Sequence, residues 1–282
     1  MTESKLLGAS EIRRLAAEID VKPTKVWGQN FVIDANTVRS IVRAAGIDAT
    51  SDVVEVGPGL GSLTLALLET AHTVTAIEID PKLAARLPLT VAEFAPESQT
   101  KMQVIQQDAM QVTELSIAPT ALVANLPYNV SVPVLLHLLK TFPSIKTALV
   151  MVQAEVAERL AAKPGSRIYG VPSVKAAWLG EARKVATIGR NVFWPAPNVD
   201  SALIRIDRHP KPLADVEEAE LFAVIDAAFS QRRKMLRSAL ATWAGSSERA
   251  TEILLKANVD PTLRGEALNI QDFIRIAEAQ HA

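Results

Sequence analysis

The sequence predicts an α/β domain built on a mostly parallel sheet, followed by a small all-helical domain. Between residues 52 and 207, short apolar and β-branched runs alternate with helical patterns, which is typical of a parallel sheet covered by helices. After residue 209 only helical periodicity remains. The segment His209-Pro210-Lys211-Pro212 separates the two patterns, because proline interrupts helices and strands alike. We therefore expect domains at 1–208 and 209–282.

The order of the expected elements follows from these patterns. Strands are expected at residues 53–56, 74–78, 102–106, 121–124 and 147–152, and helices between them at 62–68, 134–140 and 154–162. Two further strands, 183–188 and 201–206, are joined by a proline-rich segment, which favours a hairpin and an antiparallel last strand. The helical domain is expected to have its helices within 216–243, 248–257 and 270–279.

Composition excludes several kinds of site. The chain of 282 residues has no cysteine, which rules out disulfides and thiolate chemistry, and its four histidines have no ligand-like spacing. We therefore expect no metal site. The charged start of the chain and its short apolar runs argue against a signal peptide and a membrane span, so the cytoplasm is the expected compartment. Because the net charge is −1, any surface for a nucleic acid must be local.

A glycine-rich turn follows the first strand. Gly57, Gly59 and Gly61 stand where that strand passes into a helix, and glycines there allow a ligand to approach the backbone closely. Glu78 ends the second strand, where a carboxylate can accept both hydroxyls of a ribose; Asp108 follows the third, where it can accept from an adenine amino group. These residues predict a nucleoside pocket at the carboxyl edge of the sheet. The alternative is a tight turn beside two solvated carboxylates.

The segment Asn125-Leu126-Pro127-Tyr128 follows the fourth strand. The Asn125 side-chain oxygen and the Leu126 carbonyl are two acceptors that can hold the hydrogens of an aromatic amine and so free its nitrogen lone pair. Pro127 stiffens the loop, and Tyr128 offers a ring on which a flipped-out base can stack. The segment thus predicts a site where an exocyclic amine attacks an electrophile, with the rate coming from alignment. The alternative is an ordinary turn.

The order of these motifs resembles that of the ribosomal RNA adenine dimethylases, over nearly the whole chain. Gly28-Gln29-Asn30-Phe31-Val32 is similar to the family's N-terminal motif for S-adenosylmethionine, and residues 192–201 are similar to its late signature. Two positions depart from the family pattern. Val32 stands where leucine is usual, and Asn198 stands where lysine is usual. The second departure bears on one phosphate contact rather than on the chemistry.

The resemblance implies a Rossmann-like class I methyltransferase sheet, with S-adenosylmethionine as the methyl donor and no metal. It implies cofactor binding by Asn30, Val32, Gly57, Gly59, Glu78, Asp108 and Asn125, and catalysis by Asn125, Leu126, Tyr128 and Phe193. In the late signature, Phe193 is expected to help hold the flipped adenine. Taken without its signature, a phenylalanine at that position would more often be a core residue.

A cluster of cations lies in the helical domain. Residues 229–237 resemble the basic helix of the family's C-terminal domain, which implies that Arg232, Arg233, Lys234 and Arg237 bind RNA. Four cations within six residues, on a chain that is otherwise close to neutral, are compatible with a surface for phosphates. Lys22 and Lys25 could extend this surface. The alternative is a solvated helix face.

Within the family, the resemblance is closest to the branch that acts on the small ribosomal subunit. It implies dimethylation at N6 of two adjacent adenines near the 3′ end of 16S rRNA, in the small subunit or its precursor, by a monomer. The alternatives are a 23S rRNA adenine methylase that confers antibiotic resistance and a binding factor in ribosome assembly. The helical tail and residues 153–169 favour the first of these three, and an intact Asn125–Tyr128 motif argues against loss of catalysis. A DNA adenine methylase fits less well, because a second proline is typical where Leu126 stands.

Overall fold

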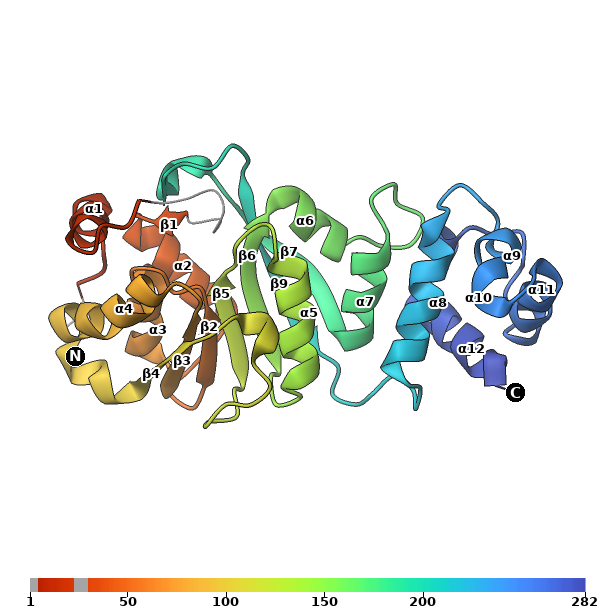
Figure 1. Cartoon of the computed structure of the whole chain (residues 1–282), viewed down its shortest axis with the longest axis horizontal. Coiled ribbons are helices and arrows are strands. Elements are labelled where there is room, and N and C mark those ends of the chain that lie inside the picture. Colours follow the sequence, from red (N-terminus) through yellow and green to blue (C-terminus); the bar gives the residue numbers. More distant parts are fainter. Residues whose placement is uncertain (1–4, 23–29, 282) are drawn as a thin grey trace. The chain divides into compact units, whose positions relative to one another are not determined.

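The structure, a computed structural model, describes residues 5–22 and 30–281 and contains a seven-stranded sheet (Figure 1). Its strands are β2 (Asp52–Val56), β3 (Thr73–Glu78), β4 (Met102–Gln106), β5 (Ala121–Asn125), β6 (Thr147–Gln153), β7 (Gly180–Ile188) and β9 (Ser201–Arg208). They lie in the order β4-β3-β2-β5-β6-β9-β7. The pairs β2–β3, β3–β4, β2–β5 and β5–β6 are parallel, whereas β9 is antiparallel to β6. The predicted α/β fold is therefore confirmed, including the antiparallel last strand.

Helix α1 precedes the first strand, and the other helices of this part of the chain lie between strands. These helices are α1 (Ala9–Glu18), α2 (Ala35–Ala45), α3 (Ser62–Thr70), α4 (Pro81–Phe94), α5 (Ser131–Thr141) and α6 (Ala154–Leu160). Helix α4 packs along β3 and β4, α2 packs on α3, and α5 packs on β6. Because helices cover the sheet, the central strands β2 and β5 are buried along nearly their whole length.

The start of α4 fixes the chain just after β3. The Asp80 side chain accepts hydrogen bonds from the N–H groups of Lys82 and Leu83, the N–H groups that a helix leaves without partners. Pro81 occupies the first helical position, where its missing N–H costs nothing. As a result, Glu78 stands at a defined point between the end of the strand and a capped helix.

An ion-pair network holds α1 against α4. Arg86 of α4 is buried, with only 6% of its surface exposed, and its guanidinium reaches Glu93 at 3.0 Å and Glu18 at 3.4 Å. Arg14 of α1 in turn pairs with both Glu18 and Glu93. Because the buried cation has two carboxylate partners, α1 is tied to the helix that follows Glu78.

Two strands that the sequence did not reveal form a separate ribbon. Strand β1 (Phe31–Val32) pairs antiparallel with β8 (Phe193–Trp194), so that Phe31 faces Trp194 and Val32 faces Phe193. Two residues are too few to produce a recognisable periodicity. The ribbon brings the N-terminal motif beside the late signature, which lies about 160 residues further along the chain.

The chain folds into two compact units. One consists of residues 1–157 and 183–208, and the other of residues 158–182 and 209–282. The second unit thus begins earlier in the sequence than the expected boundary at 208/209. The reason is that Tyr169 and Val174 are buried in the same apolar cluster as the helices that follow residue 209.

The second unit is helical. Its elements are α7 (Val171–Leu179), α8 (Glu218–Ser230), α9 (Leu236–Ala239), α10 (Ala241–Ala244), α11 (Ser247–Lys256), the short 3₁₀ turn η4 (Gly265–Ala267) and α12 (Ile270–His281). Its core includes the packed rings of Tyr169, Phe229 and Phe273. The Tyr169 hydroxyl donates to the Leu268 carbonyl at 2.8 Å, which ties the inserted segment to the end of the chain.

The expected helix over residues 216–243 is interrupted. Helix α8 ends at Ser230, and the chain turns before α9 begins at Leu236. The N–H groups of Leu236 and Arg237 donate to the carbonyls of Leu263 and Pro261 instead of to a preceding helical turn. The expectation of one basic helix was therefore wrong, because Arg232, Arg233 and Lys234 lie in the turn and only Arg237 lies in α9.

The ranges 5–22 and 30–281 contain no helix that is long and apolar enough to cross a membrane. Within the same ranges, no three His, Asp or Glu side chains are grouped so that they could hold a metal ion.

Replacing Tyr169 by phenylalanine should lower the free energy of unfolding by about 1–3 kcal/mol, because the Leu268 carbonyl loses its buried donor while the ring packing is retained. Chemical denaturation of the full chain measures the change. A free energy of unfolding equal to that of the unmodified chain would contradict the idea that this bond holds the inserted segment.

Candidate active site

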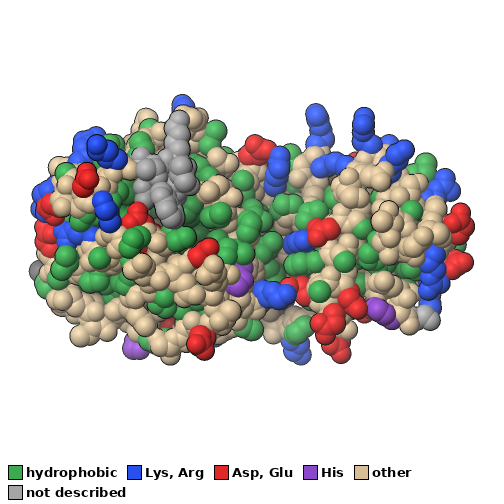
Figure 2. Space-filling model, viewed as in Figure 1, with side chains coloured by type: hydrophobic (Ala, Val, Ile, Leu, Met, Phe, Trp, Pro, Cys, Tyr) green, Lys and Arg blue, Asp and Glu red, His purple; other side chains and the backbone are tan. Residues whose placement is uncertain are grey.

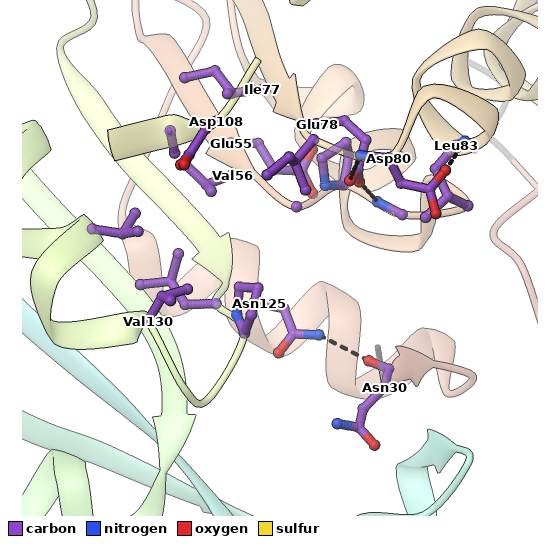
Figure 3. A pocket seen from close by; sticks show the side chains of 18 of the residues that line it. Asn30, Glu55, Val56, Ile77, Glu78, Asp80, Leu83, Asp108, Asn125 and Val130 are labelled. Carbon is purple, nitrogen blue, oxygen red and sulfur yellow. Dashed lines mark hydrogen bonds between the residues drawn. The ribbon is translucent and has the colours of Figure 1, made fainter. Parts of the chain in front are cut away.

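A pocket opens at the carboxyl ends of β2, β3, β4 and β5, with a volume of about 330 Å³. Its lining includes Asn30, Phe31, Val32, Glu55, Gly57, Gly59, Glu78, Ile79, Asp108, Met110, Asn125, Leu126, Pro127, Tyr128, Asn129 and Val130. Figure 3 shows Glu78, Asp80 and Asp108 along one side of this pocket, with Asn125 and Asn30 opposite. Such an edge, where parallel strands end, is the usual ligand site of an open α/β sheet.

The glycine turn between β2 and α3 needs residues without a side chain. Gly57, Gly59 and Gly61 have φ values of 66°, 59° and 99°, in the left-handed region that favours glycine. A Cβ on Gly59 would come within 2.8 Å of the Phe31 ring. The backbone therefore lies bare on the pocket floor, and Phe31 packs directly over it.

Glu78 is held by backbone donors at both carboxylate oxygens. Its Oε2 accepts from the Gly59 N–H at 3.1 Å, and its Oε1 accepts from the Asp80 N–H at 3.0 Å. Burial raises the pKa of Glu78, while these two N–H donors act in the opposite direction. Each oxygen retains a second lone pair, so the side chain can also accept from a ligand in the pocket.

Asp108 lies just after β4 and caps the short 3₁₀ turn η2 (Ala109–Gln111). Its Oδ1 accepts from the Met110 N–H at 2.9 Å. Ile79 and Met110 line the pocket nearby and are 44% and 40% exposed. A pocket that offers a carboxylate together with exposed apolar side chains suits a flat base that has an amino group at its edge.

Glu55 is a pocket residue to which the sequence assigned no role. Only 1% of its surface is exposed, and its Oε2 accepts from the Thr64 hydroxyl at 2.6 Å. Burial raises the pKa of Glu55 to about 8, so this carboxyl is mostly neutral at pH 7. The feature of the sequence that could have identified Glu55 as a pocket residue was its position near the end of a buried strand, just before the glycine turn.

Asn125 is oriented by the N-terminal motif. Its side-chain Nδ2 donates to the Asn30 carbonyl at 3.1 Å, so the amide oxygen faces away from Asn30 (Figure 3). The next residue, Leu126, has a buried side chain, and its N–H donates to the Met151 carbonyl of β6 at 3.1 Å. The two predicted acceptors therefore lie on a backbone segment that the sheet holds in place.

Tyr128 lies in a tight turn at the pocket wall. The Val130 N–H donates to the Pro127 carbonyl at 3.2 Å, which closes the turn around Tyr128 and Asn129. The Tyr128 hydroxyl is 2.6 Å from the hydroxyl of Ser201 on β9, and burial raises the pKa of Tyr128. This anchor on Ser201, which sequence reasoning missed, fixes the ring against rotation away from the pocket.

Phe193 does not lie in the pocket. Its side chain is 3% exposed and packs in the main apolar core together with Val32, its partner in the β1–β8 ribbon. Successive side chains of a strand point to opposite faces, and the inward face of β8 carries Phe193. Phe193 lines no part of the pocket in this structure, and its expected role in holding the flipped adenine stays a prediction.

Part of the N-terminal motif falls outside the described residues. Gly28, Gln29 and Lys25 belong to that part, whereas Asn30 and Val32 line the pocket. Lys22 is exposed near the end of the segment 5–22.

The predicted basic residues lie on the second unit. Arg232 pairs with Glu266 at 3.0 Å and donates to the Arg167 carbonyl, so it joins two loops of that unit. Arg233, Lys234 and Arg237 are exposed, as are Lys163 and Arg167 on the neighbouring loop between α6 and α7. Figure 2 shows Lys and Arg side chains gathered along this edge of the unit. The sequence did not indicate that Lys163 and Arg167, on the loop between α6 and α7, lie near the predicted cations.

Comparison with known proteins assigns the chain to a family. The family model described as ribosomal RNA adenine dimethylase matches residues 22–280. Proteins named ribosomal RNA small subunit methyltransferase A are similar along their whole length. The one from Paenarthrobacter aurescens is 60% identical, with 98% of this chain and 94% of that protein covered. The one from Streptomyces coelicolor is 61% identical, with 98% of each chain covered.

Solved structures agree with this assignment. A dimethyladenosine transferase from Plasmodium falciparum has the same fold, with a TM-score of 0.75 at 23% identity over 87% of this chain and 95% of that one. The 23S rRNA methyltransferase ErmE is similar with a TM-score of 0.67 at 26% identity, over 90% of this chain and all of that one. The matched residues 22–280 include both the pocket and most of the helical unit. The chain therefore belongs to the ribosomal RNA adenine dimethylase family, and it is a methyltransferase.

Proposed function

We propose that the protein transfers methyl groups from S-adenosylmethionine to N6 of two adjacent adenines near the 3′ end of 16S rRNA. The observation that carries the proposal is the joint position of Glu78, Asp108 and Asn125 around one pocket. The relatives at about 60% identity are named for the small subunit, which supports this substrate over 23S rRNA. We further propose that it acts as a monomer in the cytoplasm, on the small subunit or its precursor.

The pocket residues fit the nucleoside half of the methyl donor. Glu78 retains acceptor capacity for two ribose hydroxyls, and the bare backbone at Gly57 and Gly59 lets the donor approach closely. Asp108 can accept from the adenine amino group between Ile79 and Met110. The neutral Glu55 adds no second negative charge to the floor of the pocket.

The chain's own groups prepare the target amine. S-adenosylmethionine supplies a methyl group on a positively charged sulfur. The Asn125 oxygen and the Leu126 carbonyl accept the two N6 hydrogens of the target adenine, which directs the nitrogen lone pair out of the ring plane. The new N–C bond forms as the C–S bond breaks, the electron pair of that bond goes to sulfur, and the N6 proton passes to solvent. Tyr128, anchored on Ser201, stacks on the extruded base.

A second transfer to the same nitrogen needs only one of the two acceptors. After the first methylation one N6 hydrogen remains, and either the Asn125 oxygen or the Leu126 carbonyl can hold it. Stacking on Tyr128 is indifferent to methylation, so the base can be retained or rebound for the second turn. Phe193 pairs with Val32 of the pocket lining in the β1–β8 ribbon, so it also positions that residue.

The exposed cations of the second unit supply the contact with RNA phosphates. Arg233 and Lys234 extend from the turn after α8, Arg237 extends from α9, and Lys163 and Arg167 extend from the adjoining loop. Arg232 has a structural role, because it donates to the Arg167 carbonyl of that loop and pairs with Glu266 of η4. Phosphate contacts of this kind orient the RNA without reading its sequence.

Replacing Asn125 by alanine should lower the rate of methyl transfer by about 100-fold or more, because an interaction with the reacting amine is lost. Asn125→Asp keeps an acceptor oxygen but loses the N–H that donates to the Asn30 carbonyl, so its rate should lie between those of the alanine variant and the unmodified chain. Single-turnover transfer of labelled methyl groups to unmodified small-subunit particles measures both variants. Near-native turnover of the alanine variant would refute the proposed role.

Replacing Glu78 by alanine should weaken binding of S-adenosylmethionine by tenfold or more, because two charge-assisted hydrogen bonds of about 1.5–3 kcal/mol each are lost. The matched control is Glu69→Ala, an exposed carboxylate on α3 outside this pocket, which should leave the affinity unchanged. Calorimetry with the purified chain measures the two affinities. Equal affinities for both variants would remove Glu78 from the binding site.

Replacing Arg233, Lys234 and Arg237 together by alanine should weaken particle binding and flatten its dependence on salt, by a slope of about 2–3 on a log–log plot. The control replaces Lys211, Arg249 and Lys256, three other exposed cations of the same unit, so that net charge is matched. Binding of small-subunit particles is measured from low to high salt. If the salt dependence of binding flattens equally in both triple variants, the phosphate contact is not specific to Arg233, Lys234 and Arg237.

A further inference from the structure

An aromatic side chain outside the pocket continues its wall. Trp194 of β8 faces Phe31 of β1, and the two rings are stacked with centroids 6.3 Å apart and planes 26° from parallel. Phe31 lines the pocket, whereas Trp194 does not. The indole therefore stands on the outer side of a ring that forms part of the pocket wall.

Only one of the two aromatic residues of β8 is accessible. Phe193 is 3% exposed in the core, whereas Trp194 packs against the edge of the same core and keeps part of its surface in solvent. Figure 1 shows the segment that carries it beside β1.

Trp194 is close to the catalytic amide through a short chain of contacts. Phe31, its stacking partner, directly follows Asn30, and the Asn30 carbonyl accepts the hydrogen bond from Asn125. The same two-stranded ribbon thus orients the amide that holds the target amine and presents the indole outside the pocket.

We propose that Trp194 is a stacking subsite for the unpaired base next to the target adenine, an inference that rests on the proposed function. Extruding one base from a stack leaves the face of its neighbour uncovered, and an aromatic side chain can take its place. Because the two target adenines are adjacent, one neighbour of the first is the second, and this is the base that we assign to the subsite. The subsite therefore takes a purine, whose large ring favours stacking on indole.

The rival explanation is that Trp194 only covers Phe31. Two variants separate the explanations. Trp194→Leu keeps an apolar cover but removes the aromatic face, whereas Trp194→Phe keeps a smaller ring. We expect the leucine variant to raise the KM for unmodified small-subunit particles by about tenfold and the phenylalanine variant to raise it less. Affinity for S-adenosylmethionine, measured by calorimetry, should stay the same in both, because the pocket lining is unchanged.

A spectroscopic test reports on the indole directly. The chain has four tryptophans, and replacing Trp27, Trp178 and Trp243 by phenylalanine leaves Trp194 as the only one. This protein is titrated with a single-stranded RNA oligonucleotide that contains two adjacent adenines, and with the same oligonucleotide made abasic at one of them. We expect quenching of the indole fluorescence by the first and a clear loss of quenching with the second.

The outcomes are distinguishable from failure of the proposed function, because quenching requires no methyl transfer. Quenching that depends on the second adenine, in a protein that methylates no particle, would leave the subsite standing and overturn the proposed function. If the protein methylates particles but its fluorescence is quenched equally by the intact and the abasic oligonucleotide, the proposed subsite is wrong. Equal KM values for the leucine and phenylalanine variants, or a loss of donor affinity in both, would also overturn it.

Discussion

The hydrogen bond from the Gly59 N–H to the Glu78 carboxylate joins the turn after β2 to the end of β3. It forms only because Gly59 adopts a positive φ, and the missing side chain leaves room for Phe31. Phe31 lies next to Asn30, whose carbonyl orients the side-chain amide of Asn125. The side of the pocket with Glu78 and the side with Asn125 therefore both depend on the close packing of the Gly59 backbone against the Phe31 ring.

Two buried carboxyl groups of this pocket have different hydrogen-bond donors around them. Glu55 has one hydroxyl partner and complete burial, so it stays mostly neutral near pH 7. Glu78 receives two backbone N–H donors, which favour its ionised form against the effect of burial. The pocket thus holds one carboxyl that burial keeps mostly neutral beside another whose two oxygens both accept backbone hydrogen bonds. Neighbouring strands supply the two environments although the residue type is the same.

The parts of the fold that could be predicted are those with a local cause. Strands buried on both faces give continuous apolar runs, so β2 to β6 were located to within a residue or two, and strand-end residues such as Glu78 and Asn125 fell in one pocket. The β1–β8 ribbon, and hence the inward turn of Phe193, depends on pairing between distant segments. The break after α8 likewise depends on hydrogen bonds to the carbonyls of Pro261 and Leu263. These residues are distant in the sequence, so no local pattern near α8 indicates the break.

The chain leaves the first unit after residue 157, returns at 183 and leaves again after 208. Tyr169 and Val174 thus belong to a core whose other buried members lie between Leu221 and Ala279, about 50 to 110 residues later. During synthesis, residues 158–182 cannot be buried in their core until the C-terminal helices have been made. Strand β9, by contrast, joins a sheet whose other strands have already been synthesised. Neither unit corresponds to one continuous stretch of gene. An ancestor that gained or lost the helical unit by simple fusion at residue 209 would have had to remodel residues 158–182 in the same event.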